Sequence, residues 1–171
     1  MALWRDGAFV DEDWTAVADD APLPEHDRIL VSLSRWRREA DALCGREIGV
    51  EIAAGGQALA ALAEVADRPL VALRFDKFGD GRAFSYAILL RQRYGSKADL
   101  RAVGDVLLDE IPLMIRCGFT SFDISSEPTL RALREGGAPK FPLAYQPGLS
   151  EGETRDPSRP WARRLNPGVV A

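Results

Sequence analysis

The sequence predicts a single α/β domain built on a mainly parallel, five-stranded sheet. Five short apolar runs alternate with helix-like segments between residues 28 and 137, and this alternation is typical of right-handed βαβ crossovers. The chain has 171 residues, a length that fits one domain. Two arrangements satisfy the pattern: an open doubly wound sheet, or an incomplete (β/α) barrel, because five units fall short of eight.

The elements of this core are placed by apolar runs and by turn residues. Strands are expected at residues 28–33, 48–53, 70–75, 100–104 and 120–124. Helices are expected between and after them, at 36–44, 58–66, 83–94, 106–117 and 128–135. Ser34 is a suitable N-cap for the first helix, and Gly45, Gly95 and Gly118 are suitable stops.

Two flanking segments are expected to lie outside the core, which is predicted to span residues 28–137. Residues 1–27 are expected to be irregular, apart from a short strand or hairpin that turns at Gly7. Residues 138–171 hold six of the eleven prolines, so we expect a tail without long helices or central strands. Trp161 is expected to anchor this tail, in a groove of the same chain or of a second subunit.

The composition excludes several classes of function. The 22 Lys and Arg against 26 Asp and Glu give a net charge of −4, so no basic excess indicates a nucleic-acid partner. The chain has no 18-residue apolar run and no signal-peptide pattern, and we expect a cytoplasmic protein without a membrane span. One histidine (His26) and two cysteines (Cys44 and Cys117) cannot form a four-ligand zinc or iron–sulfur site, and no cofactor is expected.

The segment between residues 74 and 82 is the densest group of charges beyond a predicted strand. It holds five charged side chains and two glycines, and it opens a helix. Ligands of parallel α/β proteins bind beyond the carboxyl ends of the strands, and helix N-termini attract anions. We therefore expect an anion or substrate site there, unless the segment is a tight turn whose charges pair with one another. Its binding residues would be Gly79, Asp80, Gly81, Arg82 and, from the next strand, Arg101.

Three further residues are candidate catalytic groups. Asp105 and Asp123 follow or end adjacent predicted strands, and Lys77 lies in the charged segment. They are suited to acid–base work, and the aspartates also to holding a cation or capping a helix. We expect Asp105 to lie beside the 80–82 turn and to pair with Arg82 or Lys77. Arg91 and Arg101 belong to a basic stripe, most simply explained as a solvated helix face.

Two sequence blocks resemble a known bacterial family. They are Phe-Gly-Asp-Gly-Arg-Ala-Phe-Ser at 78–85 and Arg-Ala-Val-Gly-Asp-Val at 101–106, and the resemblance covers about residues 28–146. The family is DUF934, a domain of unknown function labelled a probable oxidoreductase of sulfite reduction. Its genes typically lie beside those of assimilatory sulfite reductase. It has no established catalytic residues that could be transferred to this chain.

The residues and the resemblance together lead to one expected function and two alternatives. We expect an accessory protein of assimilatory sulfate and sulfite reduction that binds a small oxyanion or the partner reductase, since no redox-cofactor motif is present. The first alternative is an enzyme that acts on an anionic metabolite at the carboxyl ends of the strands. The second is an interaction module that docks through the tail and Trp161. The sequence leaves open whether the chain is a homo-oligomer.

Overall fold

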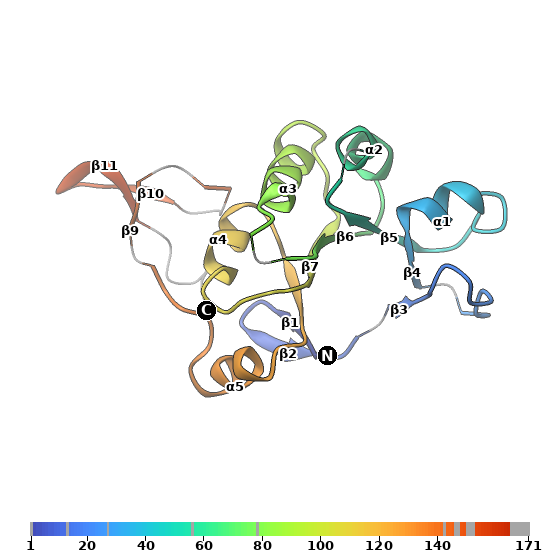
Figure 1. Ribbon diagram of the computed structural model, residues 1–171. Helices are drawn as coiled ribbons and strands as arrows, with labels where there is room; N and C mark the ends of the chain where they lie inside the picture. Colours follow the sequence, from blue (N-terminus) through green and yellow to red (C-terminus); the bar gives the residue numbers. More distant parts are fainter. Residues whose placement is uncertain are drawn as a thin grey trace.

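In the computed structural model of the protein, the described residues form an eight-stranded, mostly parallel sheet and five helices (Figure 1). The structure describes residues 2–12, 14–26, 28–55, 57–77, 79–141, 143–145, 148–149 and 153–164. The α/β fold class is confirmed, but the sheet has eight strands rather than five. Phe78, in the first family block, and residues 165–171 of the expected tail lie outside the described residues.

The parallel strands lie side by side in sequence order. They are β3 (Thr15–Ala16), β4 (Ile29–Ser32), β5 (Ile48–Ala53), β6 (Leu70–Phe75), β7 (Asp99–Gly104) and β8 (Ser121–Ile124). The helices are α1 (Leu33–Arg38), α2 (Ala58–Val65), α3 (Arg82–Gln92), α4 (Ile111–Arg116) and α5 (Glu127–Gly136). A doubly wound sheet needs a point at which the strand order reverses, and this order has none. The winding is therefore that of an incomplete (β/α) barrel.

The N-terminal segment belongs to the sheet, contrary to the expected irregular structure. β1 (Ala2–Arg5) and β2 (Ala8–Val10) form the expected hairpin, and the turn residues Asp6 and Gly7 have φ angles of 49° and 84°. β1 pairs antiparallel with β8, and Trp4 on it is only 2% exposed. The sequence does not reveal this pairing because the two partner strands are more than 100 residues apart.

The two edges of the sheet are drawn together by a very short connection. β2 and β3 are the outermost strands, yet only residues 11–14 join them. A flat sheet of this size would separate its edges by roughly 34 Å. The five Cα–Cα steps from Val10 to Thr15 span about 18 Å at most when the chain is fully extended. The sheet must therefore curl, and we call Asp11, Glu12 and Trp14 the strap, because Glu12 and Trp14 lie against its concave face.

The two faces of the sheet differ in chemistry. The face toward the helices carries the main apolar core, with Val50 and Ile52 of β5 and Phe122 of β8 among its members. The concave face carries a small apolar cluster of Leu30, Leu70, Ala72 and Val103, on which Trp14 of the strap packs. The remaining concave positions are mostly charged or small, and they include Glu51. Side-chain alternation along the strands produces this separation.

Two helices begin at residues other than those expected. α1 starts at Leu33 because Ser32, not Ser34, is its N-cap: the Ser32 hydroxyl accepts the Arg35 N–H at 3.0 Å. α4 starts at Ile111 rather than at 106. Pro112 lies in its first turn, where the missing N–H costs nothing.

The C-terminal segment forms a second, smaller sheet. β9 (Leu143–Ala144), β10 (Thr154–Asp156) and β11 (Arg159–Arg164) pair in the order β10-β11-β9, and the sheet projects from the body in Figure 1. Trp161 is 60% exposed, so it does not anchor the tail in a groove of this chain. The attachment is made instead by the Leu149 N–H, which donates to the Arg116 carbonyl at 2.7 Å, and by an Arg116–Glu153 ion pair at 3.0 Å.

Candidate functional site

The sequence-predicted site residues divide between the carboxyl edge of the sheet and its concave face. Lys77, Gly79, Asp80 and Gly81 form the β6–α3 loop, and Arg82 begins α3. Asp105 follows β7, which pairs directly with β6 through the partners Phe75 and Gly104. The expected neighbourhood of the two loops is therefore confirmed. Asp123 and Arg101 lie within β8 and β7, on the concave face.

The 80–82 turn is closed by its own ion pair. Arg82 Nε donates to Asp80 Oδ1 at 2.8 Å, and Arg82 Nη2 donates to Asp80 Oδ2 at 2.6 Å. These bonds from Arg82 lower the pKa of Asp80 to about 2. Both side-chain hydrogen bonds of Arg82 therefore go to Asp80, and the expected pairing of Arg82 with Asp105 does not form. This geometry is that of a turn whose charges neutralise each other.

Arg101 is not available to a ligand in solvent. Its side chain is 2% exposed and is held by Glu12 of the strap, by Asp99 at 3.3 Å and by the Ser121 hydroxyl at 3.3 Å. Buried arginine charges require such partners. Arg101 therefore fastens the strap to the concave face, and its expected role in anion binding is corrected.

Asp123 has a different environment. It is half-buried on the concave face, and its carboxylate accepts no side-chain or backbone hydrogen bond from the residues that the structure describes. Burial raises its pKa, and the nearby charges of Arg101 and Arg74 offset that effect in part. Arg74 itself is engaged by Glu51 through two hydrogen bonds, of 2.6 and 2.8 Å. Unlike Glu51 and Asp99, Asp123 has a carboxylate without a hydrogen-bond donor among the described residues, and it remains a candidate acid.

The charge of the carboxyl edge disfavours an anion. Residues 76–82 and 105–110 carry two cations, Lys77 and Arg82, against five carboxylates: Asp76, Asp80, Asp105, Asp109 and Glu110. Burial and the neighbouring Asp109 and Asp105 raise the pKa of Glu110, which is the response of an acid in a negative field. An oxyanion at this edge would meet the same repulsion.

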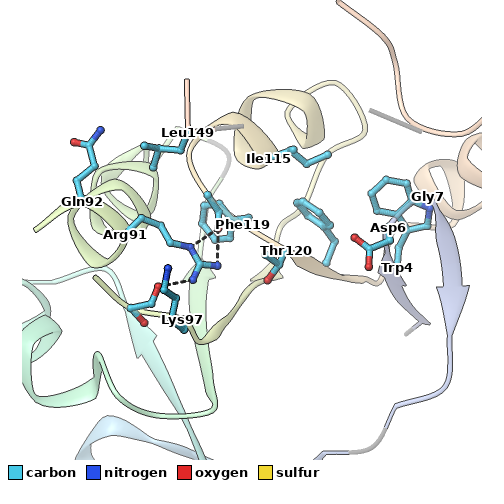
Figure 2. Close-up of a pocket in the computed structure, with 13 residues that line it drawn as sticks. Trp4, Asp6, Gly7, Arg91, Gln92, Lys97, Ile115, Phe119, Thr120 and Leu149 are labelled. Carbon is cyan, nitrogen blue, oxygen red and sulfur yellow. Dashed lines mark hydrogen bonds between the residues drawn. The ribbon is translucent and has the colours of Figure 1, made fainter. Parts of the chain in front are cut away.

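A cavity of about 460 Å³ lies at the opposite, amino edge of the sheet. Its size falls within the usual range for small-molecule sites. Figure 2 shows its walls, which come from the end of α3, the loops before β7 and β8, the β1–β2 turn and the tail. The residues that line it are Trp4, Asp6, Gly7, Arg91, Gln92, Ser96, Lys97, Ile115, Gly118, Phe119, Thr120, Phe122 and Leu149.

Arg91 gives this cavity its chemical character. Its guanidinium donates to the carbonyls of Gly118 at 2.9 and 3.1 Å, of Ser96 at 2.8 Å and of Ala98 at 2.9 Å. All of these acceptors are neutral, and burial lowers the pKa of Arg91 because the charge is only weakly compensated by Asp99. Lys97 lies beside Arg91, whereas Asp6 lies at the far end of the cavity (Figure 2). The Arg91 end therefore has an unbalanced positive charge.

Gly118 makes this arrangement possible. It has a φ of +101°, and a Cβ atom there would lie 2.7 Å from Arg91 Cγ. Sequence reasoning identified Gly118 only as a helix stop and Arg91 only as part of a solvated stripe. The cavity has no local sequence signal, because segments distant along the chain form its walls.

The cysteines and the potential metal ligands of the described residues form no further site. Cys44 and Cys117 are free, and burial raises the pKa of the Cys117 thiol. Within the described ranges, no group of three or more His, Cys, Asp or Glu side chains is arranged to hold a metal ion. None of the helices in the same ranges has the length and apolar character needed to cross a membrane.

Comparison with known proteins gives one match. The model of a family described as "Bacterial protein of unknown function (DUF934)" matches residues 49–155, which extends further into the tail than the expected resemblance. No curated protein and no solved structure matches the chain. The matched region covers well over half of the sequence and includes the α3, α4 and β8 walls of the cavity. The chain therefore belongs to the DUF934 family of bacterial proteins of unknown function.

Proposed function

We propose that this protein is an accessory protein of assimilatory sulfite reduction that binds a small oxyanion in the amino-edge cavity. The observation that supports the proposal most is the pair of cations, Arg91 and Lys97, at one end of a 460 Å³ cavity whose carboxylate, Asp6, lies at the other end. The connection with sulfite reduction comes from the family resemblance, not from the cavity.

The electrostatics of Arg91 favour an anion over a neutral ligand. A half-buried guanidinium that meets only neutral carbonyls keeps most of the desolvation cost of its charge. Its four hydrogen bonds also leave one of the two Nη2 hydrogens without an acceptor among the described residues. An oxyanion that accepted this hydrogen would gain a charge-assisted bond and would compensate the buried charge.

Lys97 would supply the second contact. Its side chain is exposed at the mouth of the cavity, so an anion can reach it without any movement of the backbone. Together the two cations would give a doubly charged oxyanion two charge-assisted contacts. The carbonyls that hold Arg91 fix its position, so the guanidinium needs no reorganisation when the anion binds.

A second candidate function uses the concave face next to the carboxyl-edge loops. Asp123, with its raised pKa and its position on the concave face near Arg74, is suited to general acid–base work on a metabolite. It is the second choice because the surrounding loops carry an excess of carboxylates, which disfavours the anionic metabolite expected there.

Calorimetric titration with sodium sulfite and sodium sulfate tests the proposal. Lys97→Ala and Lys77→Ala are a matched pair: both lysines are exposed, and they lie at opposite edges of the sheet. We expect Lys97→Ala to weaken binding by about fivefold or more, since an exposed charge contact contributes roughly 1 kcal/mol. Lys77→Ala should bind like the natural protein. The proposal is wrong if the natural protein binds neither ion at millimolar concentration, or if Lys77→Ala is the variant that weakens binding.

A further inference from the structure

The small C-terminal sheet presents one face that the other described residues leave largely exposed. Arg159, Trp161 and Arg163 alternate along β11 and so share a face, and Arg155 of β10 pairs with Arg163 and lies on the same side. This sheet stands away from the body (Figure 1). We call these four residues, together with Tyr145, the arginine–tryptophan face.

The opposite face is closed by internal contacts. Asp156 and Ala162 are buried, and Asp156 accepts hydrogen bonds from the Ser158 hydroxyl at 2.5 Å and from Arg164 Nε at 2.7 Å. These bonds hold the pKa of Asp156 well below its usual range. The Ser158 and Arg159 N–H groups also donate to Asp156. The β10–β11 turn is therefore fixed by its own side chains, which gives the arginine–tryptophan face a defined shape.

The aromatic residues of this face are unusually exposed for their size. Trp161 is 60% and Tyr145 72% exposed, and their rings pack on each other with centroids 6.2 Å apart. Each ring thus limits the motion of the other while leaving apolar surface in water. Ordered, exposed tryptophan and tyrosine side chains with neighbouring arginines have the composition of binding hot spots at protein interfaces.

The arginines carry a net positive charge for which the described part of the chain supplies no ion-pair partner. Arg155, Arg159 and Arg163 make no side-chain ion pair with the described residues, whereas Arg164, on the opposite face, is paired with Asp156. The face therefore carries three unneutralised charges on a chain with a net charge of −4. Its complement is a surface with several carboxylates around an apolar recess.

We propose that the arginine–tryptophan face docks on an acidic surface of a partner protein. A single-stranded nucleic acid fits less well, because one aromatic pair can stack with only one or two bases. Sites that bind single-stranded nucleic acid commonly span at least about four nucleotides. A second copy of the chain also fits less well. It would need a head-to-tail contact between this face and the acidic carboxyl edge, and such a contact gives a defined oligomer only where the rotation closes a ring.

Fluorescence polarisation with three labelled probes tests this proposal. The probes are a 20-residue peptide of repeated Glu-Leu-Asp-Phe, the inverse peptide of repeated Lys-Leu-Arg-Phe, and a 20-nucleotide oligothymidine. Full-length protein should bind the acidic peptide and leave the basic peptide free. Trp161→Ser and Arg163→Glu should each weaken that binding by at least about tenfold, the effect expected of a hot-spot residue.

Two matched variants control for general effects. Arg131→Glu reverses an exposed arginine on α5, and Leu59→Ser removes an exposed apolar side chain on α2; both should bind the acidic peptide like the natural protein. Circular dichroism of each variant shows that the fold is kept. The proposal is overturned if the acidic peptide does not bind, if the controls lose as much affinity as Trp161→Ser, or if oligothymidine binds more tightly. Self-association that depends on Trp161 would overturn it in favour of a second copy as the occupant.

Discussion

Replacement of Gly104 by alanine tests the register of β6 and β7, which places the carboxyl-edge loops. Gly104 has a φ of +92°, and a Cβ atom there would lie 2.4 Å from the Phe75 carbonyl oxygen. The same oxygen accepts the Asp105 N–H at 2.8 Å. Alanine must therefore adopt a strained backbone conformation and also push the two strands apart at this point.

The magnitude follows from these two effects. A positive φ costs a non-glycine residue about 1–2 kcal/mol. Relief of the contact requires a shift of more than about half an ångström and weakens the Asp105 hydrogen bond, which contributes about 1 kcal/mol. We expect Gly104→Ala to lower the free energy of unfolding by about 2–4 kcal/mol. At the usual scaling for a chain of this length, the melting temperature falls by roughly 6–12 °C.

Two further glycines separate the effects. Gly45 has a φ of +81° and no atom within 4 Å of the position that a Cβ atom would take, so Gly45→Ala should cost only the strain, about 1 kcal/mol. Gly79 has neither a positive φ nor a close neighbour, and Gly79→Ala should be neutral within about 0.5 kcal/mol. Urea unfolding, followed by fluorescence of the buried Trp4, measures all three. A Gly104→Ala protein as stable as Gly79→Ala would refute the register.

The remaining predictions concern the concave face and the tail. Asp123→Asn should stabilise the protein at pH 7. Burial raises the folded-state pKa of Asp123, so its carboxylate destabilises the fold at pH values above the unfolded-state pKa. The gain in melting temperature should therefore vanish when thermal unfolding is measured at acid pH. Glu12→Ala removes the strap's ion pair with Arg101 and should speed hydrogen exchange of the Thr15 amide about tenfold, while the β5–β7 amides keep their protection. A Thr15 amide that exchanges at the same rate in the variant and the natural protein would contradict the role of the strap. Truncation after Tyr145 should leave a folded monomer that is modestly less stable in urea, and complete unfolding would show that the small sheet belongs to the core.

The central strands were predictable because their sequence pattern is local. Residues 48–53 and 70–75 were expected as strands, and β5 and β6 have those bounds: β6 is a nearly continuous run of buried apolar residues, and β5 alternates buried Ile48, Val50 and Ile52 with other residues. Gly95 was expected to end a helix, and it follows α3 with a φ of +63°. In each case the residues concerned form the element with their own neighbours in the chain.

The rest depends on contacts between distant segments. β3 has two residues, too few for any periodicity, and it is a strand only because it pairs with β4. Arg101 lies in an apolar strand sequence that predicts burial, but only the crossing of the strap supplies Glu12 as its partner. The candidate cavity is the extreme case. Arg91 becomes a half-buried cation because Gly118 allows close approach, and this approach cannot be inferred from either residue alone.

Anomalous diffraction from crystals soaked in sodium selenite locates a bound oxyanion directly, because selenium scatters anomalously and selenite has the charge and shape of sulfite. The account predicts a selenium peak in the amino-edge cavity, within hydrogen-bond distance of Arg91 Nη2 and near Lys97 Nζ, and a weaker peak in Lys97→Ala crystals soaked at the same concentration. A peak at residues 79–82 of the carboxyl edge, with the amino-edge cavity empty of selenium, would contradict it.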